Sequence, residues 1–312
     1  MATMKAVRMH AYGKPEVLQY EDAPRPEPGA GDVLVKIHAA GVNPVDWKIR
    51  AGMTRGFIEL PLPAILGWDF SGVVEQLGPG VTGWKPGDEV YARPDLRRPG
   101  AYAEYIAVRA SEIQHKPKKL DHVQSAAIPL AALTAWQAIF DAGQLQAGQK
   151  ILIHAAAGGV GTFAVQLAKW KGAYVIGTAS ARNHPLLRDL GADELIDYNT
   201  TRFEDTAKGV DVVLDAMAGE TRERSWQVLK KGGILVSILG QPSEEKARQY
   251  GVRAAGIFVQ PNQPQLREIA NLADSGKLRP IIEAVLPLAE AARAHEMNQT
   301  QHTVGKIVLR VV

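Results

Sequence analysis

Apolar and polar residues alternate along the first third of the chain. Val33, Val35 and Ile37 are separated by single residues, the spacing that places side chains on one face of a strand. The turn-rich stretches PRPEPGAGD and WKPGDEV each come before another strand-like run. This part of the chain is therefore predicted to form antiparallel β structure.

The pattern changes around residues 123–142, where an Ala-rich stretch favours helix. Beyond it, short apolar runs alternate with helical stretches, which is typical of a parallel sheet covered on both faces. A further helix is predicted near residues 265–274, and the final run GKIVLRVV is predicted to be a strand that returns to the first domain. The predicted strands of the parallel sheet are residues 151–155, 173–178, 194–197, 211–215, 234–239 and 254–259.

These elements predict an α/β protein with two domains. Residues 1–125, completed by residues 275–312, form the β-rich domain, and residues 126–274 form the doubly wound domain with the parallel sheet. A length of 312 residues supports two domains, although a single large barrel stays an alternative. The composition, 46% hydrophobic and 22% charged, is that of an ordinary globular protein.

Charge and cysteine content exclude several function classes. The net charge is only +3, and Lys and Arg are scattered, so no nucleic acid partner is expected. The absence of Cys excludes disulfides, thiolate zinc sites and cysteine nucleophiles, and the 8 His show no HxxxH or HExxH spacing. The N-terminal residues lack the apolar core of a signal peptide, so the cytoplasm is the expected location.

One apolar segment needs a choice between two interpretations. Residues 151–168, ILIHAAAGGVGTFAVQLA, contain no Asp, Glu, Lys or Arg and reach the minimum length of a membrane span. Glycines at its middle, β-branched residues before them and a helical period after them favour a strand, a tight turn and a helix. No membrane association is therefore expected.

The turn in this segment has the spacing of a dinucleotide-binding motif. Ala156 supplies a small residue for the turn, Gly158 allows backbone to meet a pyrophosphate, and Gly161 allows helix and strand to pack closely. The diphosphate would lie over the N-terminus of the following helix, near Gly159 and Val160, where free N–H groups and the dipole favour an anion. The alternative is a tight turn that binds nothing.

The end of the second predicted strand favours NADPH over NADH. An NAD site places an acidic residue about 20 residues past the glycines, to bind the ribose 2′-hydroxyl. Here Ser180 occupies that position and Arg182 follows it. A hydroxyl and a guanidinium suit a 2′-phosphate, so NADPH is the predicted cofactor. The alternative is that Arg182 points to solvent.

With this turn in place, the chain resembles the medium-chain dehydrogenase/reductase superfamily, in its zinc-free quinone oxidoreductase and alkenal reductase branch. The resemblance covers nearly the whole chain, and it implies a GroES-like β domain joined to a Rossmann domain, an active site in the cleft between them, and a homodimer. The segments that carry it, in family order, are GVNPVDWKIRAG, LGWDFSGVV, WKPGDEVYA, GAYAEY, LTAWQAI, AAAGGVG, DVVLDAMAG, GKLRPII and VGKIVL.

The resemblance also bears on metal binding. Zinc-dependent relatives hold a catalytic metal with a Cys and a His-Glu pair, and the corresponding residues here are Asn43 and the pair Trp68 and Asp69. Trp does not ligate zinc and Asn is a poor ligand, so no metal site is expected.

By resemblance, several residues lie against the cofactor. Asn43 and Thr134 are expected beside the nicotinamide, which Thr134 would orient from the start of the interdomain helix. Phe258 and Val259, at the end of the sixth predicted strand, are expected to face the carboxamide. Tyr198 is expected to pack near the 2′-phosphate or the adenine.

Other residues are expected on the substrate side, and each has a structural alternative. Trp47 and Trp68 could instead be core residues, and Lys48 and Arg50 could instead be solvated. The alternative for Asp46 is that it caps a turn after Pro44. Tyr91 is the strongest protic candidate for protonating an enolate, with water as the alternative donor. By resemblance, Asp46, Trp47, Lys48 and Arg50 come from a loop over the substrate, and Trp68 and Tyr91 line its wall.

The function that these features predict is NADPH-dependent hydride transfer to a quinone or an α,β-unsaturated carbonyl compound. Such small-molecule acceptors tolerate weak polarisation, because the resulting enolate or hydroquinone anion is delocalised. Two alternatives stay open: a 2-enoyl thioester reductase, and a non-catalytic protein that binds NADPH. His154 is predicted to be a buried, hydrogen-bonded core residue rather than a ligand.

Overall fold

The computed structural model describes residues 2–312, which divide into two compact units. One unit contains residues 2–131, 260–276 and 280–312, and the other contains residues 132–259 and 277–279. In sequence, α3 (Pro129–Trp136) crosses the boundary and continues into a π-helical turn (Gln137–Ala142). Helix α9 (Gln263–Asp274), which the sequence pattern placed with the parallel sheet, groups with the first unit instead.

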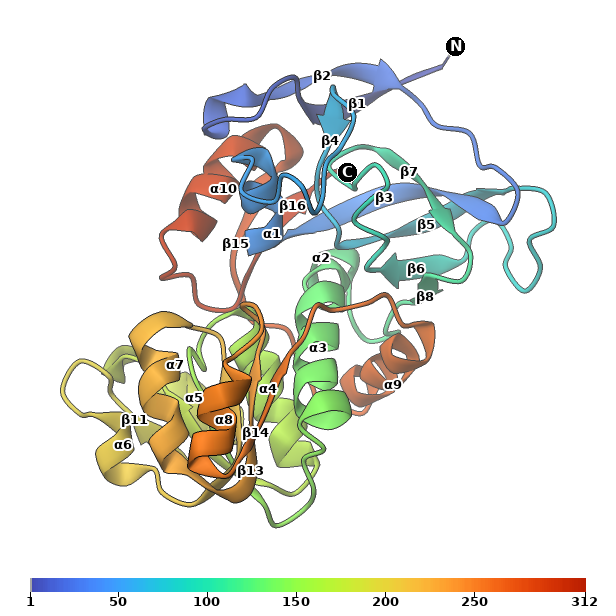
Figure 1. The fold of residues 1–312 in the computed structure, drawn as a ribbon. Helices are drawn as coiled ribbons and strands as arrows, with labels where there is room; N and C mark the ends of the chain where they lie inside the picture. The colour runs from blue at the N-terminus through green and yellow to red at the C-terminus, as the bar shows by residue number, and fades with distance from the viewer. Residues whose placement is uncertain (1) are drawn as a thin grey trace. The chain divides into compact units, whose positions relative to one another are not determined.

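The first unit is built from two sheets (Figure 1). A three-stranded antiparallel sheet has the order β2-β1-β4, and a seven-stranded sheet has the order β15-β16-β3-β5-β6-β8, with β7 also paired to β3. Their strands are β1 (Thr3–Met9), β2 (Leu18–Pro24), β3 (Asp32–Val42), β4 (Ala64–Ile65), β5 (Phe70–Leu77), β6 (Glu89–Ala92), β7 (Tyr105–Arg109), β8 (Ile113–His115), β15 (Ile282–Pro287) and β16 (Lys306–Arg310). Besides α9, the helices are α1 (Pro44–Arg50), α2 (His122–Ala126) and α10 (Ala291–Gln299).

The predicted alternation in β3 holds in part. Val33, Val35 and Ile37 are fully buried in the core of this unit and Lys36 is exposed, but Leu34, the other intervening residue, is buried as well. The C-terminal strand returns to this unit as predicted, since β16 pairs antiparallel with β3.

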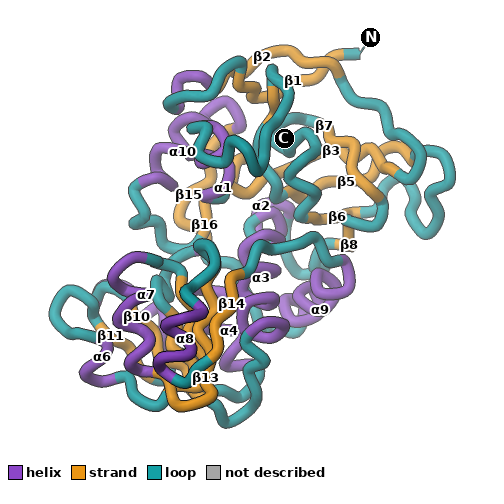
Figure 2. The backbone as a smooth tube through the Cα atoms, viewed as in Figure 1, coloured by secondary structure: helices purple, strands orange, loops and turns teal. Residues whose placement is uncertain are grey.

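The second unit contains a six-stranded parallel sheet of order β11-β10-β9-β12-β13-β14, enclosed by helices (Figure 2). This is the strand order of a doubly wound nucleotide-binding fold. Its strands are β9 (Lys150–Ile153), β10 (Tyr174–Thr178), β11 (Glu194–Ile196), β12 (Val210–Asp215), β13 (Leu229–Ser237) and β14 (Arg253–Gly256). Its helices include α4 (Gly159–Trp170), α5 (His184–Asp189), α6 (Phe203–Thr206), α7 (Gly219–Ser225) and α8 (Glu244–Tyr250).

The predicted fold class is therefore confirmed: an α/β protein with a β-rich unit and a doubly wound, Rossmann-type parallel sheet. All six predicted parallel strands are present. The largest difference is at the fifth, which begins at Leu229 rather than at residue 234, and the sixth ends at Gly256 rather than at residue 259. Within residues 2–312, no helix combines the length and the apolar character that crossing a bilayer requires.

Candidate functional site

The glycine turn (residues 155–161) joins β9 to α4 in the second unit. Gly158 is the N-cap of α4, and Gly161 lies in its first turn. A Cβ atom on Gly161 would lie 2.3 Å from the carbonyl oxygen of Ala155, so only glycine permits this approach of helix to turn. The sequence pattern predicted that the tight turn requires a small residue at Ala156, but the residue with a positive φ, 51°, is Ala155. The Ala156 N–H instead bonds the carbonyl oxygen of Thr178 at 3.0 Å.

The glycine turn fits a diphosphate group. The first N–H groups of a helix have no carbonyl partner within the helix, and together with the dipole they favour an anion. Gly158, Gly159 and Val160 are only half-buried, so this helix end is accessible. A Cβ atom on Gly158 would lie 3.3 Å from the Ala155 carbonyl oxygen, which is tight but milder than at Gly161.

The carboxyl edge of the sheet carries an exposed apolar rim. Ligands of doubly wound sheets bind outside this edge. Four large apolar side chains stand two residues past the ends of β11, β12, β13 and β14. They are Tyr198 (57% exposed), Met217 (51%), Leu239 (36%) and Phe258 (46%). Met217 and Leu239 were not predicted as site residues from the sequence. The signal that could have identified them was their position just after a predicted strand.

Ser180 and Arg182 follow β10 at the same edge. Ser180 caps a short 3₁₀ turn (Ala181–Asn183), and the Arg182 side chain is exposed, with no hydrogen bond or ion pair to any of residues 2–312. Hydrogen bonds from the backbone and side chain of Asn199 hold the pKa of the Asp197 carboxyl, in the loop that carries Tyr198, below its usual value.

Thr134 and Val259 are buried in the second unit, whereas Phe258 is exposed. Thr134 lies near the middle of the helical stretch formed by α3 and the π-helical turn, not at the start of a helix. Phe258 and Val259 follow β14 rather than end it, because the strand pairing stops at Gly256 opposite Ser237.

His154 is a satisfied core residue of this unit. Its Nδ1 lies 3.2 Å from Thr178 Oγ1, and its Nε2 lies 2.9 Å from Ser225 Oγ. Ser225 Oγ donates its only proton to the Thr221 carbonyl at 2.7 Å, so His154 carries its proton on Nε2 and accepts from Thr178. Burial lowers the pKa of His154 to about 4, so the ring is neutral, and its assignment as a core residue is confirmed.

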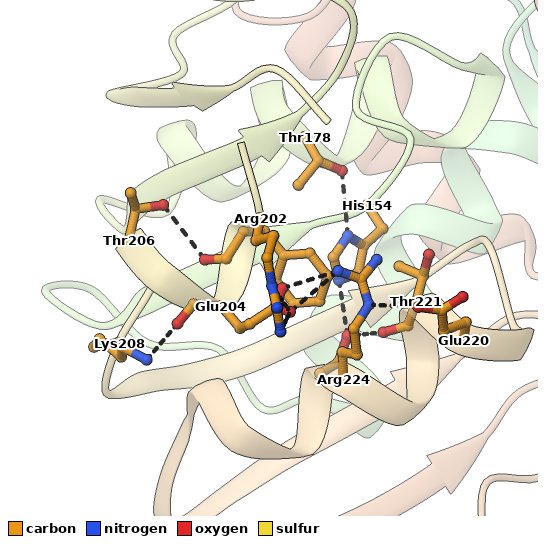
Figure 3. Close-up of polar contacts among 11 residues, drawn as sticks. His154, Thr178, Arg202, Glu204, Thr206, Lys208, Glu220, Thr221 and Arg224 are labelled. Atoms are coloured by element: carbon orange, nitrogen blue, oxygen red, sulfur yellow. Dashed lines mark hydrogen bonds and ion pairs between the residues drawn. The ribbon is translucent and has the colours of Figure 1, made fainter. Parts of the chain in front are cut away.

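A charged cluster lies beside His154. Figure 3 shows Glu204 between the side chains of Arg202 and Arg224, with N···O distances of 2.7 and 3.1 Å. Burial acts to raise the pKa of the Glu204 carboxyl, but hydrogen bonds from the backbone and from both arginines outweigh it, so this pKa lies below its usual value. The Glu204 carboxylate is paired with both arginines, which indicates a structural cluster.

Adjacent strand ends bring a second group of polar residues together in the first unit. Asn43 follows β3, Asp69 precedes β5 and Lys306 begins β16, and the antiparallel registers place these three ends next to one another. All three side chains are buried. Gly41 permits the approach, because a Cβ atom there would lie 2.8 Å from Asp69 Cβ.

The Lys306 ammonium is the centre of this group. It donates to the Val42 carbonyl at 3.0 Å, to Asp69 Oδ2 at 3.2 Å and to Asn43 Oδ1. Asn43 Nδ2 donates to Asp69 Oδ2 at 2.8 Å, and the Leu130 N–H donates to Asp69 Oδ1 at 2.6 Å. Burial raises the pKa of the Asp69 carboxyl, and the Lys306 ammonium and the amide donors oppose that rise. Both carboxyl oxygens accept hydrogen bonds, Oδ1 from Leu130 and Oδ2 from Asn43 and Lys306.

Asp46 lies on the neighbouring helix rather than on a loop. α1 spans Pro44–Arg50, and Asp46 Oδ2 accepts from the Asn43 N–H at 2.8 Å, which caps this helix. Asp46 is fully buried, and its Oδ1 has no hydrogen-bond partner among residues 2–312. Burial raises the pKa of Asp46 to about 7.

A directional hydrogen-bond chain ends on Asp46. An arginine only donates, so Arg50 donates to His295 Nδ1 at 3.4 Å, and the neutral His295 carries its proton on Nε2. His295 Nε2 lies 3.3 Å from the Tyr102 hydroxyl, which donates in turn to Asp46 Oδ2 at 2.8 Å. The alternative that Arg50 is solvated is therefore wrong, because its side chain is buried and also bonds Gly13 and Gln299.

Trp68 and Tyr91 lie in the interior of the first unit. Trp68 is fully buried and its indole N–H donates to the Arg98 carbonyl at 3.2 Å. Tyr91 is fully buried, and its hydroxyl donates to the Leu266 carbonyl at 2.6 Å, so this arrangement offers its proton to no other acceptor. Trp47 and Lys48 are half-buried on α1, with the Lys48 ammonium 5.7 Å from the centre of the Trp47 ring.

The residues present do not fit a catalytic zinc ion. Of the three side chains at the corresponding ligand positions, Asn43 and Asp69 bind the Lys306 ammonium, and the Trp68 indole bonds the Arg98 carbonyl. No group of three or more His, Asp or Glu side chains in the described part of the chain has an arrangement that could hold a metal.

Comparison with known proteins agrees with this geometry. Residues 29–118 match the family model "Alcohol dehydrogenase GroES-like domain", and residues 190–309 match the family model "Zinc-binding dehydrogenase". The chain is 36% identical to the Mus musculus protein "NAD(P)H oxidoreductase RTN4IP1, mitochondrial", over 99% of this chain and 89% of that protein. It is also 36% identical to the Arabidopsis thaliana protein "NADPH-dependent alkenal/one oxidoreductase, chloroplastic", over 98% of this chain and 79% of that protein. The solved structure of the quinone oxidoreductase from Coxiella burnetii is similar with a TM-score of 0.92 and 38% identity, over 100% of both chains.

Proposed function

Since the chain belongs to the medium-chain dehydrogenase/reductase superfamily, in its quinone oxidoreductase and alkenal reductase branch, we propose that it uses NADPH to reduce a quinone or an α,β-unsaturated carbonyl compound. The broader assignment, an NAD(P)H-dependent oxidoreductase, follows from its relatives. The observation that carries the proposal is the glycine turn, whose half-buried helix end opens at the carboxyl edge of a parallel sheet.

Two features support NADPH rather than NADH. Ser180 stands where an NAD site carries an acidic residue, so no carboxylate at that position repels a 2′-phosphate. Arg182 is two residues further on, exposed and free to bind a phosphate. The Arabidopsis relative is named as NADPH-dependent, in agreement with this choice.

The acceptor class follows from the donors that are present. With no metal ligand set among residues 2–312, acceptor polarisation depends on hydrogen bonds from the chain, which suits conjugated acceptors because the charge they acquire is delocalised. When bound, NADPH would supply hydride from C4 of its nicotinamide and become NADP⁺. For an enone, hydride addition at the β-carbon would form an enolate: the C=C pair becomes the double bond between Cα and the carbonyl carbon, and the C=O pair moves to oxygen. A proton from water at Cα would then complete the reduced product.

The experiment is a substrate panel with the purified full-length chain. Quinones, alkenals, enones and enoyl-CoA thioesters are assayed with NADPH and with NADH, by the loss of reduced-nicotinamide absorbance and by product analysis. We expect turnover of a quinone or an enone, with a higher kcat/KM for NADPH than for NADH. Turnover confined to enoyl-CoA and sensitive to salt would assign the 2-enoyl thioester reductase instead. Cofactor binding without turnover of any acceptor would contradict an enzymatic role.

A further inference from the structure

The proposed function assigns no role to the buried Lys306 ammonium of the first unit. Lys306 is 3% exposed and its partner Asp69 is 0% exposed. Each of the three ammonium protons has an acceptor: the Val42 carbonyl, Asn43 Oδ1 and Asp69 Oδ2. Taking both charges out of water is costly, and structural ion pairs of this kind are often replaceable by apolar residues. A functional role for the Lys306–Asp69 ion pair would explain why two buried charges, rather than apolar residues, lie beside Asn43.

The pair fixes the orientation of the Asn43 amide. The amide oxygen accepts from the ammonium, and Nδ2 donates to the carboxylate at 2.8 Å. A half-turn of the amide would place Nδ2 against the ammonium and the oxygen against the carboxylate, and both contacts would be repulsive. Lys306 and Asp69 therefore select one of the two amide orientations.

The selected orientation leaves one amide proton available. Asn43 Nδ2 carries two protons. One is donated to Asp69, and the other has no acceptor among residues 2–312. The amide oxygen at the same time accepts from a full positive charge. Polarisation of this kind strengthens the donors of the same amide, because hydrogen bonds in a chain reinforce one another.

We propose that Lys306 and Asp69 are positioning residues that hold the Asn43 amide so that its second Nδ2 proton is donated to the carbonyl oxygen of the acceptor. This inference rests on the proposed function. As hydride reaches the conjugated carbon, negative charge develops on the acceptor oxygen, and a donor already oriented toward it stabilises that charge without reorganisation. The ammonium acts through Asn43 and does not touch the acceptor.

The test is a double-mutant cycle on kcat. Asn43→Ala removes the donor and is expected to lower kcat about 100-fold, the range measured for loss of one oxyanion donor. Lys306→Met keeps the aliphatic stem but releases the amide, with an expected loss of roughly 10-fold. The double variant is expected to be no slower than Asn43→Ala alone, because the two residues act through one proton. The Kd for NADPH, measured by fluorescence titration, is expected to be unchanged.

Lys116 provides a matched control. It is also buried in the first unit, where its ammonium contacts the carbonyls of Pro117 and Leu120 and lies 3.4 Å from Glu89, but it shares no partner with Asn43. Lys116→Met is expected to lower stability and leave kcat unchanged. If Lys306→Met is unstable, Asp69→Asn combined with Lys306→Met removes both charges together and is expected to show the same loss of kcat. An unchanged kcat in Lys306→Met, or losses that multiply in the double variant with Asn43→Ala, would overturn the proposal.

A second readout separates this inference from the proposed function. Selective ¹⁵N labelling of Asn gives the side-chain amide signals of the free protein, with no turnover required. Wild type is expected to show one slowly exchanging, inequivalent proton pair at Asn43, and Lys306→Met is expected to increase its exchange at least 10-fold. A protein that turns over no acceptor but keeps this NMR effect would contradict the proposed function alone. Equal exchange in both proteins would contradict the positioning role alone.

Discussion

The Tyr102 hydroxyl donates a 2.8 Å hydrogen bond to Asp46 Oδ2, although both residues are completely buried. Burial and the neighbouring Asp46 raise the pKa of Tyr102 well above its usual value, so the hydroxyl keeps its proton and stays a donor. Asp46 thus receives two hydrogen bonds on Oδ2 and none on Oδ1. Burial outweighs these bonds, which leaves the carboxyl with a pKa of about 7.

We expect Asp46 to make stability depend on pH. Its pKa in the folded protein, about 7, lies above the unfolded value of 3.8, so the folded state holds this proton more tightly. The stabilisation is complete below pH 3.8, is lost as the pH rises to about 7, and changes no further above that. The loss approaches ~4 kcal/mol, at ~1.4 kcal/mol per pH unit.

Asp46→Asn keeps an acceptor for Tyr102 and removes the titration. The free energy of unfolding of each protein is measured with urea at several pH values between 4 and 8. Buried histidines such as His154 and His295, with pKa values of about 4 and about 3, contribute the opposite slope, but they are common to both proteins. The difference between the proteins should therefore shift in favour of Asp46→Asn as the pH rises. A difference that is constant with pH would show that Asp46 does not titrate in this range.

Gly161 and Gly158 should respond differently to alanine. At Gly161 the added Cβ atom meets the Ala155 carbonyl oxygen at 2.3 Å, so we expect a loss of about 1–3 kcal/mol in unfolding free energy and no increase in Tm on adding NADPH. At Gly158 the same contact is 3.3 Å, so the fold should survive while NADPH binds more weakly. Gly29→Ala, with its closest contact at 3.7 Å in the first unit, is the control and should change neither property. Equal effects at Gly158 and Gly161 would contradict this graded interpretation.

The parallel sheet and the glycine turn were predictable because their signals are local. A strand buried on both faces leaves a continuous apolar run, and the turn must contain glycine wherever backbone meets backbone. α1 had a local signal too, since Pro44 at the first helical position and Asp46 at the third are typical of a helix start. The expectation of a loop there overlooked that signal.

The polar groups of the first unit were not predictable in the same way. Lys306 meets Asn43 and Asp69 across 263 and 237 residues of sequence, through the registers of β16, β3 and β5. Arg50 likewise meets His295 and Gln299 across 245 and 249 residues. Register between distant strands depends on the whole packed sheet, so no local pattern shows that these charges are buried and paired.

Ser225→Ala should destabilise the second unit without affecting catalysis. The change removes the acceptor of His154 Nε2, and an unsatisfied buried donor costs about 1–3 kcal/mol. The kcat should be unchanged, because both side chains are buried and hydrogen-bonded within the second unit. Ser275→Ala is the control: Ser275 makes a similar bond to the Leu272 carbonyl but is exposed and has no histidine partner, so about 0.5 kcal/mol or less is expected. A loss of kcat at unchanged stability would assign His154 a role in the reaction.

Arg182 should determine the preference for NADPH. Its exposed guanidinium has no partner in the described chain, so Arg182→Ala should leave the protein folded and weaken NADPH binding about 10-fold through loss of a charge-assisted hydrogen bond. NADH lacks the 2′-phosphate, and its Kd should stay the same.

Ser180→Asp tests the same preference from the opposite direction. The new carboxylate would accept from a ribose 2′-hydroxyl and repel a 2′-phosphate, so NADH should become the better cofactor. Arg188→Ala, which removes another exposed arginine from the neighbouring helix α5, is the control and should alter neither Kd. Dissociation constants for both cofactors are measured by tryptophan fluorescence in all four proteins, at one fixed salt concentration because screening weakens phosphate contacts. If Arg182→Ala weakens the binding of NADPH and NADH equally, the arginine does not bind the 2′-phosphate. Ser180 would then be the only residue that supports a preference for NADPH.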